Sequence, residues 1–362
     1  MFEQFTMGVI EGFYGPAWSF AARAGYARFL RENGFAFYIY APKGDLSLRK
    51  RWRDAWSADD RAALEALRDR YREVGVAFGV GLTPFGTQSQ YGAEERRALE
   101  RKIRDLDALD LDIFALLFDD VPGVPADLAE RQVAITHDAL AVSEACGFLM
   151  CPTYYADDPI LDKVSGPRPA RYLETLGAKL EPRVRVFWTG PRICSPEYSE
   201  AHLAAVARRI GRKPFLWDNY PVNDGPRMAK HLHLRAVTGR PHGLATWSAG
   251  LAANPMNQAE LSKLPLATLQ QSLQAGDAYE PQRAFESAAR ALWGPALAAA
   301  LAEDLALFQD AGLDAIDADA RERLVAKYRE LASPAAAEVV AWLQGAFLPT
   351  EQLLAEFAGT GL

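Results

Sequence analysis

The sequence is poor in cysteine, and the three cysteines that it has form no recognisable framework. Cys146, Cys151 and Cys194 include no C-x-x-C pair, and three thiols cannot all pair with one another. This pattern argues against a zinc site and is typical of a reducing compartment. We therefore expect buried thiols without a chemical role.

Segments that direct a protein to a membrane are also lacking. No stretch reads as long and apolar enough to span a bilayer. Residues 1–6 show neither the basic region nor the apolar region of a cleavable leader. These absences predict a cytoplasmic protein with no membrane partner.

Long basic runs are absent as well. Against 40 lysines and arginines stand 47 aspartates and glutamates, which gives a formal net charge of −7. Proteins that bind nucleic acid usually carry a basic patch, so we expect no nucleic-acid partner. The charge balance favours a substrate that is neutral or is held by local groups.

What the chain does have is a series of short apolar runs at intervals of about 30 to 40 residues, the spacing of strand–helix units. The runs begin near Met7, Ala36, Ala77, Ile113, Phe148, Val184, Phe215 and Gly243. Helix-period stretches such as residues 59–74 fill several of the gaps. Eight such units predict an α/β fold, a (β/α)8 TIM barrel, over residues 1–265.

The remainder, residues 266–362, is rich in alanine and leucine at helical spacing. Glycine and proline divide it into predicted helices at residues 281–293, 295–311, 318–331 and 334–348. We interpret this part as a small α-helical C-terminal domain that caps the barrel or forms a subunit contact. Its apolar composition is consistent with a homodimer.

One apolar run ends in two adjacent carboxylates. Residues 113–118 are uninterrupted apolar residues, and Asp119 and Asp120 follow directly. Because burying an unpaired charge costs several kcal/mol, the carboxylates should emerge where the strand leaves the core. Barrel enzymes place their active sites on that face, so the pair predicts the mouth of a pocket.

Two neighbouring carboxylates support more than one chemistry. Successive strand residues point to opposite faces, so the pair does not match a nucleophile and an acid about 5 Å apart across a sugar. One protonated and one ionised carboxyl would suit glycoside hydrolysis in which the substrate's 2-acetamido group attacks. A divalent cation site that uses Asp218 or Asp224, and a cap on the next helix, are alternatives that the residues leave open.

Aromatic and polar residues near the other strand ends favour a sugar, since sugar sites combine aromatic platforms with hydrogen-bonding groups. The aromatic candidates are Tyr155, Trp188, Trp217 and Trp247, and the polar candidates are Lys43, Asn219, Asp224 and Asn254. Each alone has a simpler explanation, such as core packing for a tryptophan or a turn for Asn254 before Pro255. Their clustering at strand ends is the evidence for a shared site.

Six motifs, taken in order, resemble the catalytic domain of the O-GlcNAcase family, glycoside hydrolase family 84. They are GVIEGFYG at 8–15, YAPK at 40–43, FALLFDD at 114–120, CPTYY at 151–155, WTGP at 188–191, and WDN at 217–219 followed by ND at 223–224. The resemblance extends from about residue 8 to residue 257. It implies a retaining exo-β-N-acetylglucosaminidase that works through an oxazoline intermediate, without a metal or an organic cofactor.

The resemblance also implies roles for individual residues. Asp119 would orient and polarise the 2-acetamido group, and Asp120 would serve as general acid and then as general base. The implied sugar contacts are Tyr155, Trp217 and Asn219 near the acetamido and leaving groups, and the Gly12 backbone, Lys43, Asp224 and Asn254 at the hydroxyls. A one-residue shift would exchange Tyr154 for Tyr155.

The implied substrate is a β-GlcNAc-bearing glycoconjugate, either a glycoprotein or an oligosaccharide. A second hypothesis is a carbohydrate-binding barrel that kept the pocket and lost turnover. The presence of both Asp119 and Asp120 favours the enzyme, because a pure binder does not need a proton donor beside the leaving oxygen.

Overall fold

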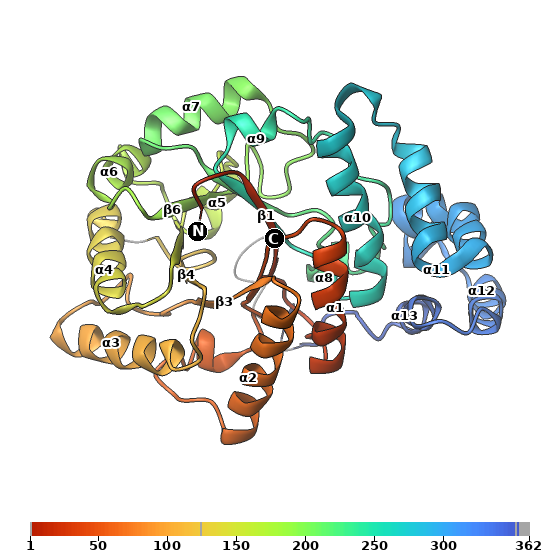
Figure 1. The fold of residues 1–362 in the computed structure, drawn as a ribbon, viewed down its shortest axis with the longest axis horizontal. Coiled ribbons are helices and arrows are strands. Elements are labelled where there is room, and N and C mark those ends of the chain that lie inside the picture. Colours follow the sequence, from red (N-terminus) through yellow and green to blue (C-terminus); the bar gives the residue numbers. More distant parts are fainter. Residues whose placement is uncertain (1, 124, 352, 355–362) are drawn as a thin grey trace.

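Eight parallel strands close into a barrel in the computed structural model, which describes residues 2–123, 125–351 and 353–354 (Figure 1). The strands are β1 (Thr6–Glu11), β2 (Phe37–Tyr40), β3 (Ala77–Leu82), β4 (Ile113–Leu117), β5 (Gly147–Cys151), β6 (Arg185–Trp188), β7 (Phe215–Asp218) and β8 (Gly250–Ala253). They pair in chain order, and β1 pairs with β8, with Met7 opposite Leu251. The predicted (β/α)8 barrel is confirmed.

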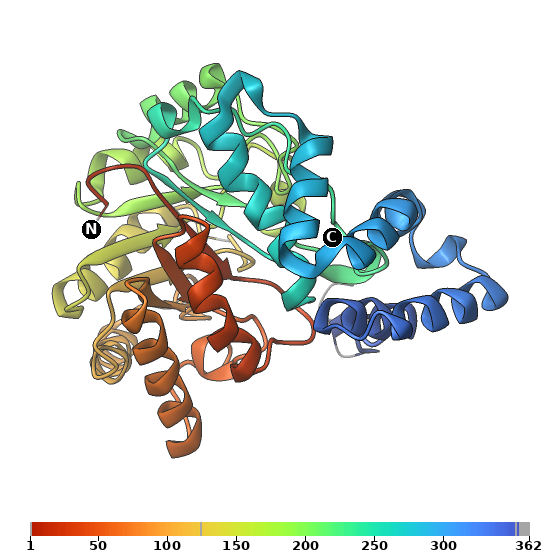
Figure 2. The same cartoon turned by 45° about the vertical axis from the view of Figure 1, so that its right-hand side comes forward.

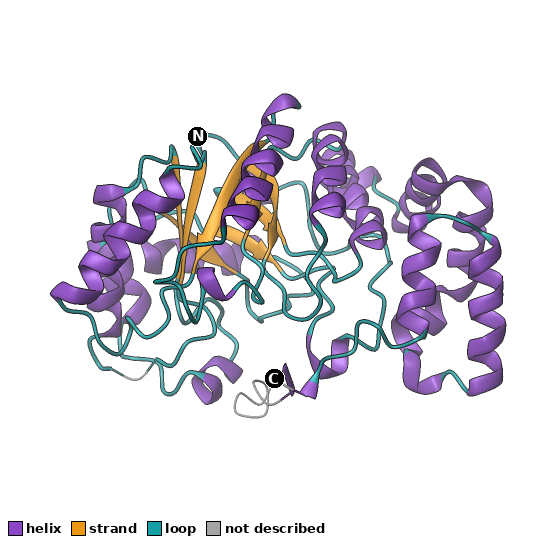
Figure 3. Cartoon of the chain, turned by 90° about the horizontal axis from the view of Figure 1, so that it is seen from below, coloured by secondary structure: helices purple, strands orange, loops and turns teal. Residues whose placement is uncertain are grey.

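Helices surround the strands, which Figure 3 shows in orange at the centre. Those around the barrel are α1 (Phe20–Glu32), α2 (Ala58–Glu73), α3 (Ala93–Asp107), α4 (Leu128–Val142), α5 (Ile160–Val164), α6 (Tyr172–Lys179), α7 (Glu200–Ile210), α8 (Gly225–Met228), α9 (Leu244–Trp247) and α10 (Ala259–Ala275). The helix predicted at residues 59–74 is α2. Its start is fixed by Ser57, whose side chain accepts a hydrogen bond from the Asp60 amide.

The strands are covered on both faces. Every strand residue is buried except the first residue of β1, β3 and β6. Burial on both faces explains why the strands appear in the sequence as continuous apolar runs and not as alternating patterns. It also leaves the loops beyond the strand ends as the place for polar chemistry.

The eighth strand is not where the sequence predicted it. The predicted strand near Gly243, ending at Trp247, is the short helix α9, and β8 follows at Gly250–Ala253. The true strand was missed because Gly-Leu-Ala-Ala contains no β-branched or aromatic residue. Gly250 is needed there, since a Cβ atom would lie 2.3 Å from the Phe215 ring.

Three further helices form a group beside α10, drawn in blue in Figures 1 and 2. They are α11 (Pro281–Ala306), α12 (Ala318–Glu330) and α13 (Pro334–Leu343). The two helices predicted on either side of residue 294 are merged into α11 with a break at Gly294, where φ is 81°. Helix α10 runs without interruption through the predicted division at residue 265, and separate domains stay a prediction.

Two expectations from composition are wrong. By length and composition the helical stretch Pro281–Ala311 could span a bilayer, with 31 residues, mean hydropathy 1.4 and 28% of the apolar window buried. It was missed because its apolarity is mostly alanine and the break at Gly294 divides it. Buried helices in the core of a protein can have the same length and hydropathy.

The cysteines differ from the expectation of buried thiols. Cys151 is buried, but Cys146 and Cys194 are exposed.

Candidate active site

A cavity of about 620 Å³ lies at the carboxyl ends of the strands, where the loops gather in Figure 3. It is lined by all nine residues selected from the sequence: Gly12, Lys43, Asp119, Asp120, Tyr155, Trp217, Asn219, Asp224 and Asn254. Trp217 belongs to β7, and the other eight come from the loops after β1, β2, β4, β5, β7 and β8. Strands that share one direction bring these distant segments to one end of the barrel.

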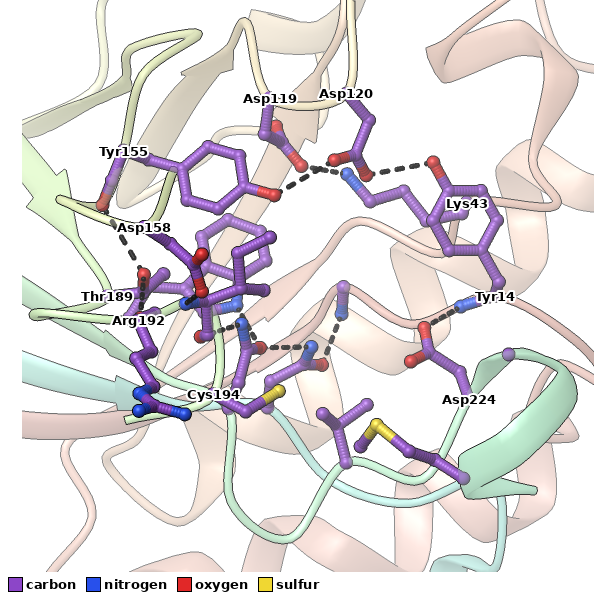
Figure 4. A pocket seen from close by; sticks show the side chains of 18 of the residues that line it. Tyr14, Lys43, Asp119, Asp120, Tyr155, Asp158, Thr189, Arg192, Cys194 and Asp224 are labelled. Carbon is purple, nitrogen blue, oxygen red and sulfur yellow. Dashed lines mark hydrogen bonds and ion pairs between the residues drawn. The ribbon is translucent and has the colours of Figure 1, made fainter. Parts of the chain in front are cut away.

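Asp119 lies in the turn beyond β4, and its two carboxylate oxygens have different surroundings. Oδ2 pairs with the Lys43 ammonium, and both side chains are almost fully buried (Figure 4). Oδ1 is buried and has no hydrogen-bond partner among the described residues. Burying an acceptor without a hydrogen-bond partner costs about 1–3 kcal/mol, unless a ligand supplies a donor.

Asp120 occupies the left-handed backbone region, with φ of 55°. Its Oδ2 accepts a hydrogen bond from the Tyr14 hydroxyl at 2.9 Å, and its Oδ1 accepts one from the Tyr155 hydroxyl at 3.0 Å. Both contacts are visible in Figure 4. The alternation expected for two strand residues does not apply, because β4 ends at Leu117 and both carboxylates belong to the following turn.

A hydrogen-bonded wall lines another side of the pocket. The Trp217 indole N–H donates to Asn219 Oδ1 at 3.0 Å, and Asn254 Nδ2 donates to the same oxygen at 3.0 Å. The Gly12 amide donates to Asn254 Oδ1 at 3.1 Å. The Trp217 ring lies so close to Gly12 that a Cβ atom there would be 2.3 Å from it. These four residues form one rigid unit.

Asp224 directly precedes α8 and accepts a hydrogen bond from the Tyr14 amide at 2.7 Å. Burial raises the pKa of its carboxyl to about 6, and the charge of Asp120 acts in the same direction. The Tyr14 amide and the Lys43 ammonium partly oppose that rise in pKa. Burial thus moves the pKa of this carboxyl closer to neutral pH.

Comparison with known proteins agrees with this geometry. The profile of the family described as beta-N-acetylglucosaminidase matches residues 7–309. The chain belongs to this family.

Named relatives of this β-N-acetylglucosaminidase family member are animal and bacterial proteins. Protein O-GlcNAcase from Rattus norvegicus and from Mus musculus are each 32% identical over 276 residues, 74% of this chain and 30% of theirs. The chain thus spans about 30% of the length of these curated relatives. An O-GlcNAc hydrolase variant of Thermobaculum terrenum is 28% identical, with a TM-score of 0.75 over 95% of this chain and 82% of that one.

Not every aromatic candidate reaches the pocket of this family member. The Trp188 ring is fully buried, and its indole N–H donates to His202 Nε2 on α7 at 3.1 Å. Trp247 belongs to α9, which precedes β8 and so does not follow a strand end. Tyr154 donates its hydroxyl hydrogen to the Gly166 carbonyl at 2.7 Å, whereas Tyr155 lines the pocket. Trp188 and Trp247 are therefore not sugar platforms.

Asp218 does not serve as a metal ligand in this arrangement. Both of its oxygens accept hydrogen bonds from Arg240, at 2.6 and 2.9 Å, and both side chains are buried. Within the described ranges, no group of three or more histidine, cysteine, aspartate or glutamate side chains is arranged to hold a metal ion. The Asp119 and Asp120 carboxylates are engaged by Lys43 and by tyrosines.

Two residues in contact with the side chains of the pocket were not selected from the sequence. Tyr14 lies within the motif at residues 8–15, but only Gly12 was selected there, although an aromatic residue just past a strand end is itself a signal. Arg49 donates to the Tyr14 hydroxyl at 2.7 Å from the irregular segment between β2 and α2. No strand end marks its position, so sequence pattern alone could not have found it.

Proposed function

We propose that the chain is a retaining exo-β-N-acetylglucosaminidase that removes terminal β-linked GlcNAc by substrate-assisted catalysis. The observation that carries the proposal is Asp119, a residue that lines the pocket and whose buried Oδ1 has no hydrogen-bond partner among the described residues. A 2-acetamido N–H is a donor that this oxygen could accept.

In the first step the acetamido oxygen attacks the anomeric carbon, and the bond to the glycosidic oxygen breaks. Asp119 accepts a hydrogen bond from the acetamido N–H, which keeps its proton, and Asp120 gives its proton to the leaving oxygen. In the second step water attacks the same carbon and opens the oxazoline, and Asp120 takes the proton of that water. Two displacements at one carbon retain the β configuration.

The remaining pocket residues support a GlcNAc ligand. Trp217 offers an aromatic wall that its contacts with Gly12 and Asn219 hold in place. Lys43 pairs with Asp119 and so orients that carboxylate, and Asp224 and Asn254 line the same pocket, where sugar hydroxyls would lie. The mechanism uses no metal or organic cofactor, and the aglycone is a glycoprotein or an oligosaccharide.

The test is hydrolysis of aryl β-N-acetylglucosaminides by the wild-type, Asp119→Asn and Asp120→Asn proteins, each checked for its fold. We expect Asp120→Asn to lose about 10²–10⁴-fold in rate on poor leaving groups and much less on activated ones, because only poor leaving groups need protonation. Asp119→Asn should fail on both. Equal losses on good and poor leaving groups in both variants would refute these roles.

The same assay separates the enzyme from a carbohydrate-binding barrel. A folded wild-type protein that binds GlcNAc but leaves activated glycosides intact would establish the binding protein instead.

We also propose a cytoplasmic location, which the exposed thiols Cys146 and Cys194 support because free exposed thiols are uncommon in oxidising compartments. The homodimer stays a prediction, to be checked by sedimentation.

A further inference from the structure

The Asp120 carboxyl is held on both of its oxygens by tyrosine hydroxyls. Tyr14 reaches it from the loop after β1 and Tyr155 from the loop after β5. The backbone of Asp120 has φ of 55°, in the left-handed region that aspartate enters more readily than most residues with a side chain. The two tyrosine contacts therefore define the position of this carboxyl.

Arg49 fixes the direction of one of these hydrogen bonds. A guanidinium has donors and no acceptor, so Arg49 must donate to the Tyr14 oxygen, 2.7 Å from its Nη2 atom. A hydroxyl has a single proton, and in this arrangement the Tyr14 proton points to Asp120. Burial raises the pKa of the Tyr14 hydroxyl well above its ordinary value, so that proton is retained.

Packing holds Arg49 in place for this task. Its side chain is buried, and its guanidinium lies over the Tyr14 ring, 5.0 Å from the ring centre. A cation stacked on a ring and bonded to the hydroxyl of that ring restrains both the position and the rotation of the tyrosine. The chain of contacts therefore runs from a loop after β2 to the carboxyl after β4.

We propose that Arg49, acting through the Tyr14 hydroxyl, is a positioning residue that orients Asp120 for proton transfer to the glycosidic oxygen. The inference rests on the proposed function, because it assigns Arg49 to the general acid. A carboxyl oxygen has two lone-pair directions, so the oxygen that accepts from a tyrosine can still face the substrate. The proton moves from Asp120 to the leaving oxygen as the bond to the anomeric carbon breaks, and Arg49 and Tyr14 keep theirs.

The experiment compares kcat/KM on aryl β-N-acetylglucosaminides of good and poor leaving ability. We expect Arg49→Met and Tyr14→Phe to lose about tenfold on poor leaving groups and less than about twofold on activated ones, since a misplaced acid matters only where protonation is needed. Arg49→Lys, which keeps a donor, should recover part of the loss. The matched control is Arg53→Gln, since Arg53 is exposed and lies over the Trp52 ring away from the pocket.

A second comparison excludes a merely structural role. In the Asp120→Asn background, Arg49→Met should cause no further loss on a substrate that the single variant still turns over, because the residue it positions is gone. Additive losses, or equal losses on good and poor leaving groups, would overturn the inference. If Asp120→Asn itself shows no dependence on the leaving group, the proposed function fails. If it does and Arg49→Met matches Arg53→Gln, only this inference fails.

Discussion

At the scale of single residues, the pocket is defined by which atoms remain available after each side chain has made its own contacts. Lys43 occupies one oxygen of Asp119 and leaves the other for a ligand. Tyr14 and Tyr155 each donate a hydrogen bond to one oxygen of Asp120, and each of these oxygens has a second lone pair. The two adjacent carboxylates thus differ in the atoms that they offer to a ligand, because their hydrogen-bond partners differ.

Gly12 offers a direct test of the Trp217 wall. Gly12→Ala would place a methyl group 2.3 Å from the Trp217 ring, so the ring must move and its hydrogen bond to Asn219 must change. We expect kcat/KM on an aryl β-N-acetylglucosaminide to fall by about tenfold or more, since overpacking costs about 1–3 kcal/mol. Gly44→Ala is the control, because a Cβ atom there meets nothing within 4 Å. Equal activity of the two variants would contradict the rigid wall.

Asp224 gives the pocket a dependence on pH. Its pKa is raised to about 6, and an ionised carboxylate accepts hydrogen bonds from sugar hydroxyls more strongly than a protonated one. We expect the contribution of Asp224 to kcat/KM to fall by about tenfold between pH 7 and pH 5 as it gains a proton. The ratio of wild-type to Asp224→Asn activity isolates this effect, and a ratio independent of pH would contradict it.

The Asp224 carboxyl also affects the stability of the fold, but its contribution falls as the pH rises, whereas its contribution to activity increases. Because its pKa is raised on folding, the unfolded chain releases this proton first as the pH rises from about 4. The contribution of Asp224 to the free energy of unfolding should therefore decline up to about pH 6 and stay constant above it. Thermal unfolding of the wild type and of Asp224→Asn should converge or cross over that range. A constant difference in melting temperature between pH 4 and pH 7 would be the contrary result.

The residues that sequence reasoning found and missed differ in a physical way. Asp119 and Asp120 could be found because carboxylates directly after a buried run must lie at its end. Arg49 and the left-handed turn of Asp120 could not, because neither changes the local pattern of apolar residues. The pairing of Lys43 with Asp119 joins residues 76 positions apart and depends on the closed barrel.

At the scale of elements, seven strands could be predicted because burial on both faces leaves an apolar run. Strand β8 could not, because its residues are mostly glycine and alanine, which give no strand signal. Helix α10, which follows β8, begins at Ala259 without a capping side chain of its own. Glu338 on α13 supplies the missing acceptor, with Oε1 and Oε2 each 2.9 Å from the amides of Glu260 and Leu261. A distant helix thus completes the start of α10.

Removing this cap should weaken the fold. We expect Glu338→Ala to lower the free energy of unfolding by about 1–2 kcal/mol, the usual cost of a lost helix cap. Glu322→Ala on α12 is the control, because Glu322 is exposed in the same group of helices. Urea unfolding of both variants measures this difference. Equal urea concentrations at the midpoint of unfolding would show that Glu338 does not cap α10.

At the scale of the whole molecule, the C-terminal helices are bonded to the segment that follows α8. The Leu232 amide donates to the Phe308 carbonyl at 3.0 Å, the Leu313 amide to the Lys230 carbonyl at 2.9 Å, and the Trp342 indole to the Ala229 carbonyl at 3.1 Å. Arg227 and Met228, just before this segment, line the pocket. These hydrogen bonds therefore join the C-terminal helices to the segment beside the pocket rim.

This connection predicts one cooperative unfolding transition. Calorimetric and van't Hoff enthalpies should agree, and tryptophan fluorescence should change together with far-ultraviolet circular dichroism. Two resolved transitions, with the helices melting before the barrel, would show that the bonds across the segment after α8 contribute little.

The cap that Glu338 provides also bears on how such a barrel can change over evolution. A gene that lost the last helix would lose more than a surface appendage, because α10 starts five residues after Asn254 in the pocket and would begin with unsatisfied amides. A barrel transferred without α13 would lose about 1–2 kcal/mol of stability unless another acceptor replaced Glu338. This cost favours variants that keep the last helix together with the pocket.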